Sequence, residues 1–288
     1  MNSVLKQMIS NYSLNDKNDY INAIKEIVQE ITLSALASSD FFDHAAFYGG
    51  TALRIFYGLD RFSEDLDFSL VAKENFDIES YFNYIRDAFK KLGMNIITEK
   101  KDKTSDSNIQ SAFLKGNTLE HMLLIEVENS IVDHIQKTDV IKVKFEIDVN
   151  PPADATFEFK YRILPTPYKI RLYDKESLFA GKLHAVICRK WKNRFKGRDL
   201  YDYIYYISTN TKINLKHLES RLIESQKWNS NDELTLEDVK KLLLDRFKEI
   251  DFIQAKQDVM GFINDKNKLD LWSYDFFAAI TNDYFNKL

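Results

Sequence analysis

The most constraining feature of this 288-residue chain is one segment, FYGGTALRIFYGLDRFSEDLDFSL, in which a double-glycine turn precedes an alternating run with two acids. Glycine tolerates positive φ and has no Cβ, so Gly49 and Gly50 allow chain and ligand to approach closely. A helix that starts here points unpaired N–H groups outward, which suits phosphate. Thr51 either caps that helix or donates its hydroxyl to a phosphate oxygen. The order predicts a turn, a short helix, a polar loop and then an acidic strand.

The acidic run DLDFSL alternates strictly between polar and apolar residues, which predicts a β-strand with two different faces. Asp65 and Asp67 share the polar face with Ser69, at a Cα spacing of about 6.5–7 Å. Two carboxylates at that spacing suit a hard cation such as Mg²⁺, which keeps coordination sites for substrate phosphates. Ser63, in the preceding loop, is a candidate auxiliary residue. Each motif alone is typical of an ordinary turn or a solvated strand edge, but their order favours a functional site.

A third acid ends a second alternating segment, IKVKFEIDVNPP, whose strand is expected to stop at Pro151-Pro152. Asp148 stands on the polar face at the end of this strand. Beside the first acidic strand it would complete a metal-binding set, or accept a proton from an attacking hydroxyl. For Lys144 and Glu146, on the same face, we favour a solvated surface of mixed charge.

A helix is predicted from about Lys175 to Trp191, with Asp174 as its N-cap. Lys182 falls at the margin of the apolar face of this helix, and Arg189 lies two turns further along the same stripe. The Lys182 ammonium either extends to solvent or reaches into a site.

The densest positive cluster of the chain follows this helix. It consists of Arg189, Lys190, Lys192, Arg194, Lys196 and Arg198, with Trp191 and Phe195 between them. The cluster is either a solvated helix end or an electrostatic track for an RNA backbone with rings for stacking. A further helix starts near Arg198. Asp199 and Asp202 either stabilise its first turns through the helix dipole or face a site, where Asp199 would orient Lys182 or Arg198, or act as an auxiliary acid or base.

These segments together resemble the AbiEii/AbiGii toxin-type nucleotidyltransferases of the polymerase-β-like nucleotidyltransferase superfamily. The resemblance covers most of residues 40–210 and rests on GGTAL, RFSEDLDFSL, KFEIDVNPP and LFAGKLHAVICRKWKNRFKGRDLYDYIYYIS. The superfamily motifs correspond to Gly49-Gly50, Asp65, Asp67 and Asp148. The additions of the toxin family correspond to Lys182, Arg198, Asp199 and Asp202. Thr51 replaces the usual serine and keeps the hydroxyl.

The resemblance implies an α+β fold, in which a mixed nucleotidyltransferase sheet with flanking helices precedes an all-helical domain. It implies transfer of an NMP from an NTP to an acceptor hydroxyl, with Mg²⁺ or Mn²⁺ on Asp65, Asp67 and Asp148. The nucleotide phosphates would contact Gly49–Thr51, Arg189 and Arg198, and Lys182 would stabilise the departing pyrophosphate. The implied role is that of a bacterial abortive-infection or toxin–antitoxin toxin, with a genetically linked antitoxin. RNA such as tRNA is the favoured acceptor and a protein hydroxyl the second.

The composition limits the alternatives. A hydrophobic content of 44% with only 8 Gly and 4 Pro indicates an ordered globular protein. The net charge of −4 argues against a general nucleic-acid binder, so any RNA must meet a local patch. Cys188 is the single cysteine, which excludes intramolecular disulfides and is consistent with a reducing cytoplasm. We expect a cytoplasmic protein without membrane spans, since no apolar run approaches the roughly 20 residues a bilayer requires.

We expect a nucleotidyltransferase domain at 1–170 and a helical domain at 171–288 that completes an active-site cleft. Strands are predicted at 94–100, 108–115, 122–127, 140–149 and 168–172, and 101–107 reads as a polar linker. Helices are predicted at 18–39, 78–92, 175–191, 198–208, 213–225, 235–249, 252–264 and 272–285. Two rival functions remain: a non-catalytic nucleotide- or RNA-binding module, and a metal-dependent phosphohydrolase using the same acids.

Overall fold

The computed structural model describes residues 3–100, 109–117, 133, 140–151, 153–189 and 196–287. By its internal contacts the chain divides into two compact units. The sheet unit comprises Met1–Thr51, Ser63–Pro151 and Glu158–Leu172, and the helical unit comprises Ala52–Phe62, Pro152–Phe157 and Tyr173–Leu288. Two short segments from before the predicted boundary at residue 170 therefore group with the helical unit.

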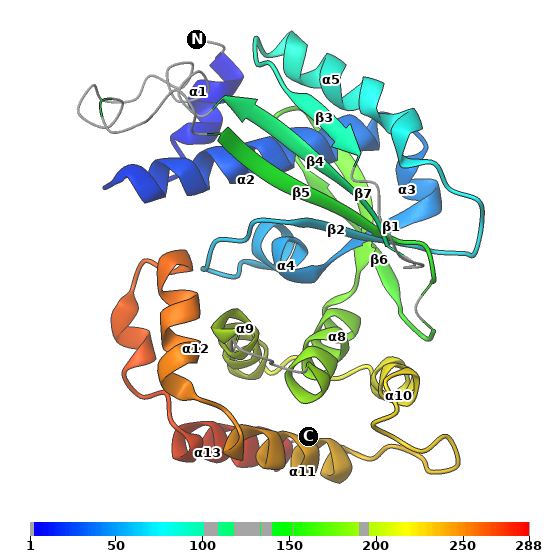
Figure 1. The fold of residues 1–288 in the computed structure, drawn as a ribbon, viewed down its shortest axis with the longest axis vertical. Helices are drawn as coiled ribbons and strands as arrows, with labels where there is room; N and C mark the ends of the chain where they lie inside the picture. The colour runs from blue at the N-terminus through cyan, green and yellow to red at the C-terminus, as the bar shows by residue number, and fades with distance from the viewer. Residues whose placement is uncertain are drawn as a thin grey trace. The chain divides into compact units, whose positions relative to one another are not determined.

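The sheet unit is built on a mixed sheet of seven strands among the described residues, in the order β3-β4-β5-β2-β1-β7-β6 (Figure 1). The strands are β1 (Ala45–Tyr48), β2 (Leu66–Leu70), β3 (Ile97–Lys100), β4 (Ile109–Asn117), β5 (Val140–Asp148), β6 (Phe157–Arg162) and β7 (Tyr168–Tyr173). Strand β2 runs antiparallel to β1 and parallel to β5. The mixed sheet, with an all-helical second unit, confirms the predicted α+β class.

Helices pack on one face of this sheet. They are α2 (Lys17–Ala37), α3 (Phe41–His44) and α5 (Phe82–Lys91), with α1 (Ser3–Ile9) and the 3₁₀ turn η1 (Ile78–Tyr81). The buried Phe41 ring of α3 lies 5.0 Å from Phe68 of β2 and 6.1 Å from Phe145 of β5, both edge-on. Because alternate strand residues face opposite ways, the aromatic core leaves Asp67 and Asp148 on the other face.

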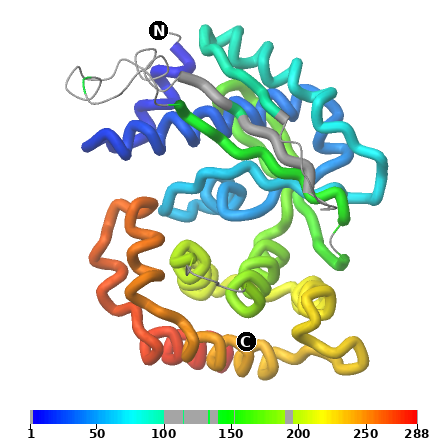
Figure 2. Tube along the Cα trace, viewed as in Figure 1, coloured from blue at the N-terminus to red at the C-terminus, as the bar shows by residue number. Residues whose placement is uncertain are grey.

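The helical unit contains only helices and connecting turns from Lys175 onward within the part that the structure describes. They are α8 (Lys175–Cys188), α9 (Gly197–Ser208), α10 (Leu215–Glu224), α11 (Leu236–Lys248), α12 (Phe252–Val259) and α13 (Tyr274–Phe285), with the 3₁₀ turns η2 (Met260–Phe262) and η3 (Lys266–Leu269). Asp174 accepts the Ser177 N–H at 2.8 Å, which confirms the predicted N-cap of α8. Helices α11 and α13 lie side by side (Figure 2). The core of the unit includes the rings of Phe179, Tyr203 and Tyr206.

The predicted strand at 122–127 and the linker at 101–107 lie outside the described residues. Two strands were missed: β1, which is only four residues long, and β6, which closely follows the proline pair. A stretch of four residues is too short to show a period, and the proline pair was used only as the end of the strand before it. No helix among the described residues combines the length and apolarity that crossing a bilayer requires.

Candidate functional site

The glycine turn lies directly against one of the strand acids. Helix α4 (Gly49–Tyr57) starts at the turn, and Gly49 has a φ of +83°. A Cβ added at Gly49 would stand 2.6 Å from Asp67 Oδ2, so only glycine leaves room for this carboxylate. Gly50 follows in the first turn of α4, where main-chain N–H groups have no acceptor within the helix. The structure thus places a carboxylate beside a set of N–H donors.

The hydroxyl of Thr51 serves the fold. Thr51 is fully buried, and its Oγ1 donates to the main-chain carbonyl oxygen of Asp65. In this structure the hydroxyl proton is used inside the chain, and the contact with phosphate stays a prediction. The bond fixes the start of α4 to the residue that precedes β2.

Helix α2 holds the loop that carries the acids. The amide Nε2 of buried Gln29 donates to the main-chain carbonyl of Ser63 at 3.0 Å, and Lys25 pairs with Glu64 at 2.9 Å. Ser63 itself is half-buried. These contacts position the loop through its backbone and a neighbouring acid, and they support an anchoring role for this segment.

Two of the predicted acids, Asp67 and Asp148, lie on neighbouring strands. In the parallel pairing of β2 with β5, Asp67 is the partner of Glu146 and Ser69 is the partner of Asp148. Asp67 and Asp148 therefore share one face of the sheet, and Asp65 directly precedes β2. All three aspartates are half-buried.

Two further contacts distinguish the acids of β5. The Oδ1 atom of Asp148 accepts the N–H of Asn150 at 3.0 Å, which turns the chain at the end of the strand. Glu146 pairs with Lys144 at 2.7 Å, and both side chains are partly exposed. This ion pair agrees with the solvated surface of mixed charge expected for Lys144 and Glu146.

The donor chemistry of these acids fits a hard divalent cation. Asp65, Asp67 and Asp148 supply carboxylate oxygens, the ligands that Mg²⁺ uses when it binds with substrate phosphates. Across the described ranges, however, no three His, Cys, Asp or Glu side chains are gathered closely enough to hold an ion. The fit is therefore one of donor type and strand placement rather than of a preformed cage.

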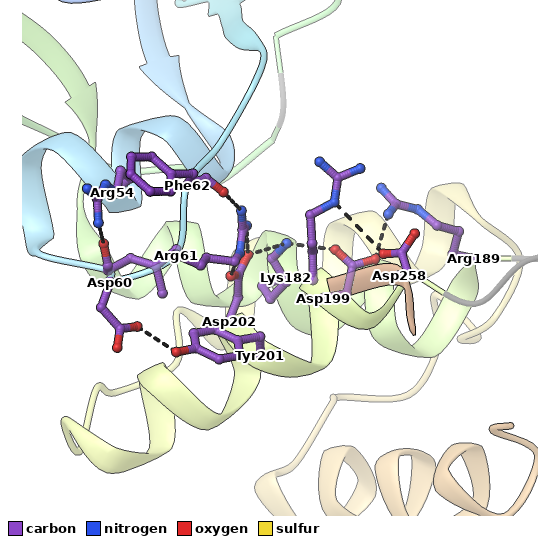
Figure 3. Close-up of polar contacts among 12 residues, drawn as sticks. Arg54, Asp60, Arg61, Phe62, Lys182, Arg189, Asp199, Tyr201, Asp202 and Asp258 are labelled. Atoms are coloured by element: carbon purple, nitrogen blue, oxygen red, sulfur yellow. Dashed lines mark hydrogen bonds and ion pairs between the residues drawn. The ribbon is translucent and has the colours of Figure 1, made fainter. Parts of the chain in front are cut away.

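The remaining predicted residues belong to a charged network in the helical unit (Figure 3). Lys182 Nζ of α8 lies 2.7 Å from Asp199 Oδ1 and 2.8 Å from Asp202 Oδ2, both on α9. Arg189 Nη1 donates to Asp199 Oδ2 at 2.5 Å. Asp199 thus orients Lys182, as predicted among the alternatives, together with Arg189. Because the Lys182 ammonium is bound to two carboxylates, the alternative in which it extends to solvent is wrong.

Asp202 is the most deeply buried member of the network, and side chains of the chain itself bind its carboxylate. Its second partner is Arg61, which the sequence analysis did not single out. Arg61 Nε and Nη2 donate to the two oxygens of Asp202 at 2.6 and 2.7 Å, and Nη1 donates to the Phe62 carbonyl at 2.8 Å. This is the bidentate geometry that makes arginine–carboxylate pairs strong. In the sequence Arg61 stands between Asp60 and Phe62, four residues before Asp65, and no local pattern marks it as buried.

Opposite charges determine the protonation of the network. Burial alone would raise the pKa of Asp199, but Lys182 and Arg189 outweigh it and lower that pKa. Burial would lower the pKa of Lys182, but Asp199 and Asp202 raise it. The pKa of Arg61 is also raised, since Asp202 outweighs burial. Asp199 and the two cations are therefore charged at neutral pH.

The family model for the nucleotidyl transferase AbiEii toxins of type IV toxin–antitoxin systems matches residues 31–281. The chain belongs to the AbiEii family. No protein of curated function matches it. The nucleotidyltransferase toxin MenT4 of Mycobacterium tuberculosis superposes with a TM-score of 0.53 at 14% identity, over 98% of this chain and 90% of MenT4. JHP933 of Helicobacter pylori gives a TM-score of 0.49 at 20% identity, over 92% of this chain and 91% of JHP933. The MenT4 likeness shows that the fold is shared.

Membership of the AbiEii family confirms the resemblance noted in the sequence, and the match includes both the strand acids and the charged network. Part of the predicted basic cluster, residues 190–195, lies outside the described residues of this family member. The Arg198 guanidinium lies 4.2 Å over the Phe262 ring, and its Nε is 3.9 Å from an Asp258 oxygen. Burial, followed by the nearby Arg189, lowers the pKa of Lys196. The RNA track at 189–198 stays a prediction.

Proposed function

We propose that this AbiEii-family protein is a metal-dependent nucleotidyltransferase that moves an NMP from an NTP to an acceptor hydroxyl. The observation that supports this most is the pairing of β2 with β5, which puts Asp67 and Asp148 on one sheet face with Asp67 against Gly49. Phosphoryl transfer requires groups that bind phosphate and a cation that stabilises its charge. A glycine turn at a helix start can supply the first, and carboxylates suited to Mg²⁺ can hold the second.

In this proposal Asp65, Asp67 and Asp148 hold Mg²⁺ or Mn²⁺, which supplies positive charge to the nucleotide phosphates. Main-chain N–H groups at Gly49–Thr51 bind phosphate oxygens at the start of α4. The oxygen of the acceptor hydroxyl forms a bond to the α-phosphorus, and Asp148 accepts the proton that this hydroxyl loses. The bond from the α-phosphorus to the bridging oxygen then breaks, and pyrophosphate leaves.

The family pattern assigns a further role to Lys182. We propose that its ammonium neutralises charge on the departing pyrophosphate, with Asp199 as the positioning residue for Lys182. Arg189 and Arg198 are proposed contacts for the same phosphates. Asp199 and Asp202 raise the pKa of Lys182, so its ammonium is protonated at neutral pH.

The proposed acceptor is RNA, with tRNA first, and a protein hydroxyl is the second candidate. The AbiEii match supports a toxin role and implies an antitoxin encoded nearby. Whether that antitoxin binds this chain directly is a separate question, which co-purification of the two proteins would answer.

The test is transfer of radiolabel from α-labelled NTPs to total tRNA in the presence of Mg²⁺, with Asp67→Asn as the inactive variant. We expect labelled RNA from the wild type and none from the variant. Release of phosphate without a nucleotide adduct would identify a phosphohydrolase. Binding of nucleotide without any product, for every NTP and acceptor tried, would identify a non-catalytic module.

A further inference from the structure

In the edge strand β6 the aromatic side chains face solvent, whereas an ordinary surface strand turns its charged side chains outward. Its rings at Phe159 and Tyr161 are 49% and 72% exposed, and Ile163, just beyond the strand, is 76% exposed. The charged residues that alternate with them are less exposed, and one of them, Arg162, reaches the buried Glu30 at 2.6 Å. A soluble protein places apolar side chains outward in a row where a partner binds them.

Two cations from the neighbouring strand β7 lie on the same rings. The ammonium of Lys169 is 4.3 Å from the Phe159 ring centre and 5.9 Å from that of Tyr161. The guanidinium of Arg171 is 5.3 Å from the Phe159 ring centre. These four residues, two rings and two cations, form what we call the aromatic–cationic strip.

The strip lies on the same face of the sheet as the strand acids. Leu172 of β7 is the Cα partner of Phe47 of β1, and both face the aromatic core. Lys169 and Arg171 alternate with the core-facing residues of β7, so they point to the opposite face. Asp67 pairs with the residue after Phe47 and therefore points to that face as well.

We propose that the aromatic–cationic strip binds single-stranded RNA, with bases stacked on Phe159 and Tyr161 and phosphates held by Lys169 and Arg171. Alternate residues of a strand lie about 6.5–7 Å apart, which gives each ring room for one base. Aromatic rings beside cations are the means by which proteins bind single strands without reading sequence. The proposal rests on the proposed function in one respect, that the bound strand is the acceptor of the nucleotide.

Charge favours RNA over a protein partner or a second copy of the chain. The four residues of the strip include two cations and no acid, while the whole chain carries a net charge of −4. A second copy would bring a strip of the same sign, and the two pairs of cations would repel each other. A polyanion with stackable bases complements both features of the strip.

The test is fluorescence anisotropy of the full-length protein with a labelled oligouridine of about ten nucleotides, at low salt and without NTP. We expect Tyr161→Leu and Phe159→Leu each to weaken the Kd by about tenfold, since leucine keeps an apolar side chain but removes the stacking plane. Tyr161→Phe should bind as the wild type does. Lys169→Ala should reduce the slope of log K against log salt by about 1.

Tyr84→Leu is the matched control, because it removes a ring of 46% exposure from α5, which packs on the opposite face of the sheet from the strip. An unchanged Kd for Tyr161→Leu would overturn the proposal. A fall in molar mass of the RNA-free protein by light scattering, in the ring variants alone, would also overturn it in favour of an interface between copies.

Because binding is measured without chemistry, the two proposals can fail separately. Ring-dependent binding by a protein that transfers no nucleotide would refute the proposed function and leave the strip as an RNA site. Transfer with an unchanged KM for RNA in Tyr161→Leu would refute the strip and leave the proposed function.

Discussion

The aspartates of the sheet unit and those of the helical unit differ in burial and in the partners of their carboxylates. In the sheet unit Asp65, Asp67 and Asp148 are half-buried and share a face with the glycine turn. In the helical unit Asp199 and Asp202 are buried and bound at 2.5–2.8 Å by lysine and arginine side chains. Carboxylates of the second kind are bound by cations of the chain itself, whereas those of the first kind stand on the sheet face that we assign to Mg²⁺.

This difference predicts that substitutions in the two units affect different properties, stability in one and activity in the other. Removing one member of a buried ion network leaves an uncompensated charge, so the network contributes mainly to the stability and position of Lys182. Asp148→Asn keeps a side chain of the same shape with an oxygen that can accept the Asn150 N–H, so we expect its effect to appear mainly in activity. The sheet acids should therefore affect catalysis and the network should affect stability.

The largest expected effect is the loss of nucleotide transfer in Asp148→Asn. Removing the proposed proton acceptor and metal ligand should lower kcat by about 10³–10⁴-fold, with thermal stability near that of the wild type. Initial rates of label transfer measure it. Glu146→Gln, two residues earlier on the same face of β5, is the matched control and should stay within a few-fold of the wild type. Equal losses in both variants would contradict a specific role for Asp148.

The next largest effect is a loss of stability when Arg61 is replaced. Arg61→Met leaves the carboxylate of Asp202 buried without its bidentate partner, which should lower the free energy of unfolding by about 3 kcal/mol. Urea unfolding followed by circular dichroism measures it. The double variant Arg61→Met/Asp202→Leu should recover part of the loss, because no charge is then stranded. A double variant less stable than the single one would show that Asp202 stabilises the fold through its other partner, Lys182, and not only through Arg61.

A smaller effect is expected at the glycine turn. Gly49→Ala and Gly93→Ala both force alanine into a positive φ, of +83° and +79°, and each should lose about 1–2 kcal/mol of stability. Only at Gly49 does the new Cβ meet a carboxylate, that of Asp67. Transfer should therefore fall by about 10²-fold in Gly49→Ala alone, when assayed where both variants are folded. Similar transfer rates in Gly49→Ala and Gly93→Ala would show that the glycine turn takes no part in the reaction.

The smallest effect is a pH dependence of stability from the charged network. The lowered pKa of Asp199 gives stability that is present above its ordinary value of 3.8 and is lost as the pH falls through the lowered pKa. The raised pKa of Lys182 gives stability that is present below its ordinary value of 10.5 and is lost as the pH rises through the raised pKa. Unfolding free energies across this range should show a plateau between the two values. In Asp199→Asn the fall of the unfolding free energy at acidic pH should be smaller than in the wild type. An unchanged fall would contradict the assignment of this pH dependence to Asp199.

Local patterns predicted the parts of the site that depend on neighbours in sequence. The alternation around Asp67 and Asp148 indicated strands with acidic faces, and the cap at Asp174 follows from the residue type and the helix after it. The strip was missed because the alternation in β6 does not say which face is covered. Rings placed outward look the same in sequence as rings placed inward.

Long-range contacts explain the other errors. Arg61 acquires its role from Asp202, which lies 141 residues further along the chain. For Thr51 a helix cap and a phosphate contact were both considered, and the bond from its hydroxyl to the Asp65 carbonyl was not foreseen. Neither partner can be read from periodicity, since both depend on how segments distant in sequence come together.

The central claim is that three aspartates of the sheet unit hold the catalytic cation beside the glycine turn. The most direct measurement is anomalous scattering from crystals grown with Mn²⁺ and a non-hydrolysable NTP. The account predicts a manganese peak coordinated by carboxylate oxygens of Asp65, Asp67 and Asp148. A peak bound by other residues, with nucleotide present and these three carboxylates uninvolved, would contradict it.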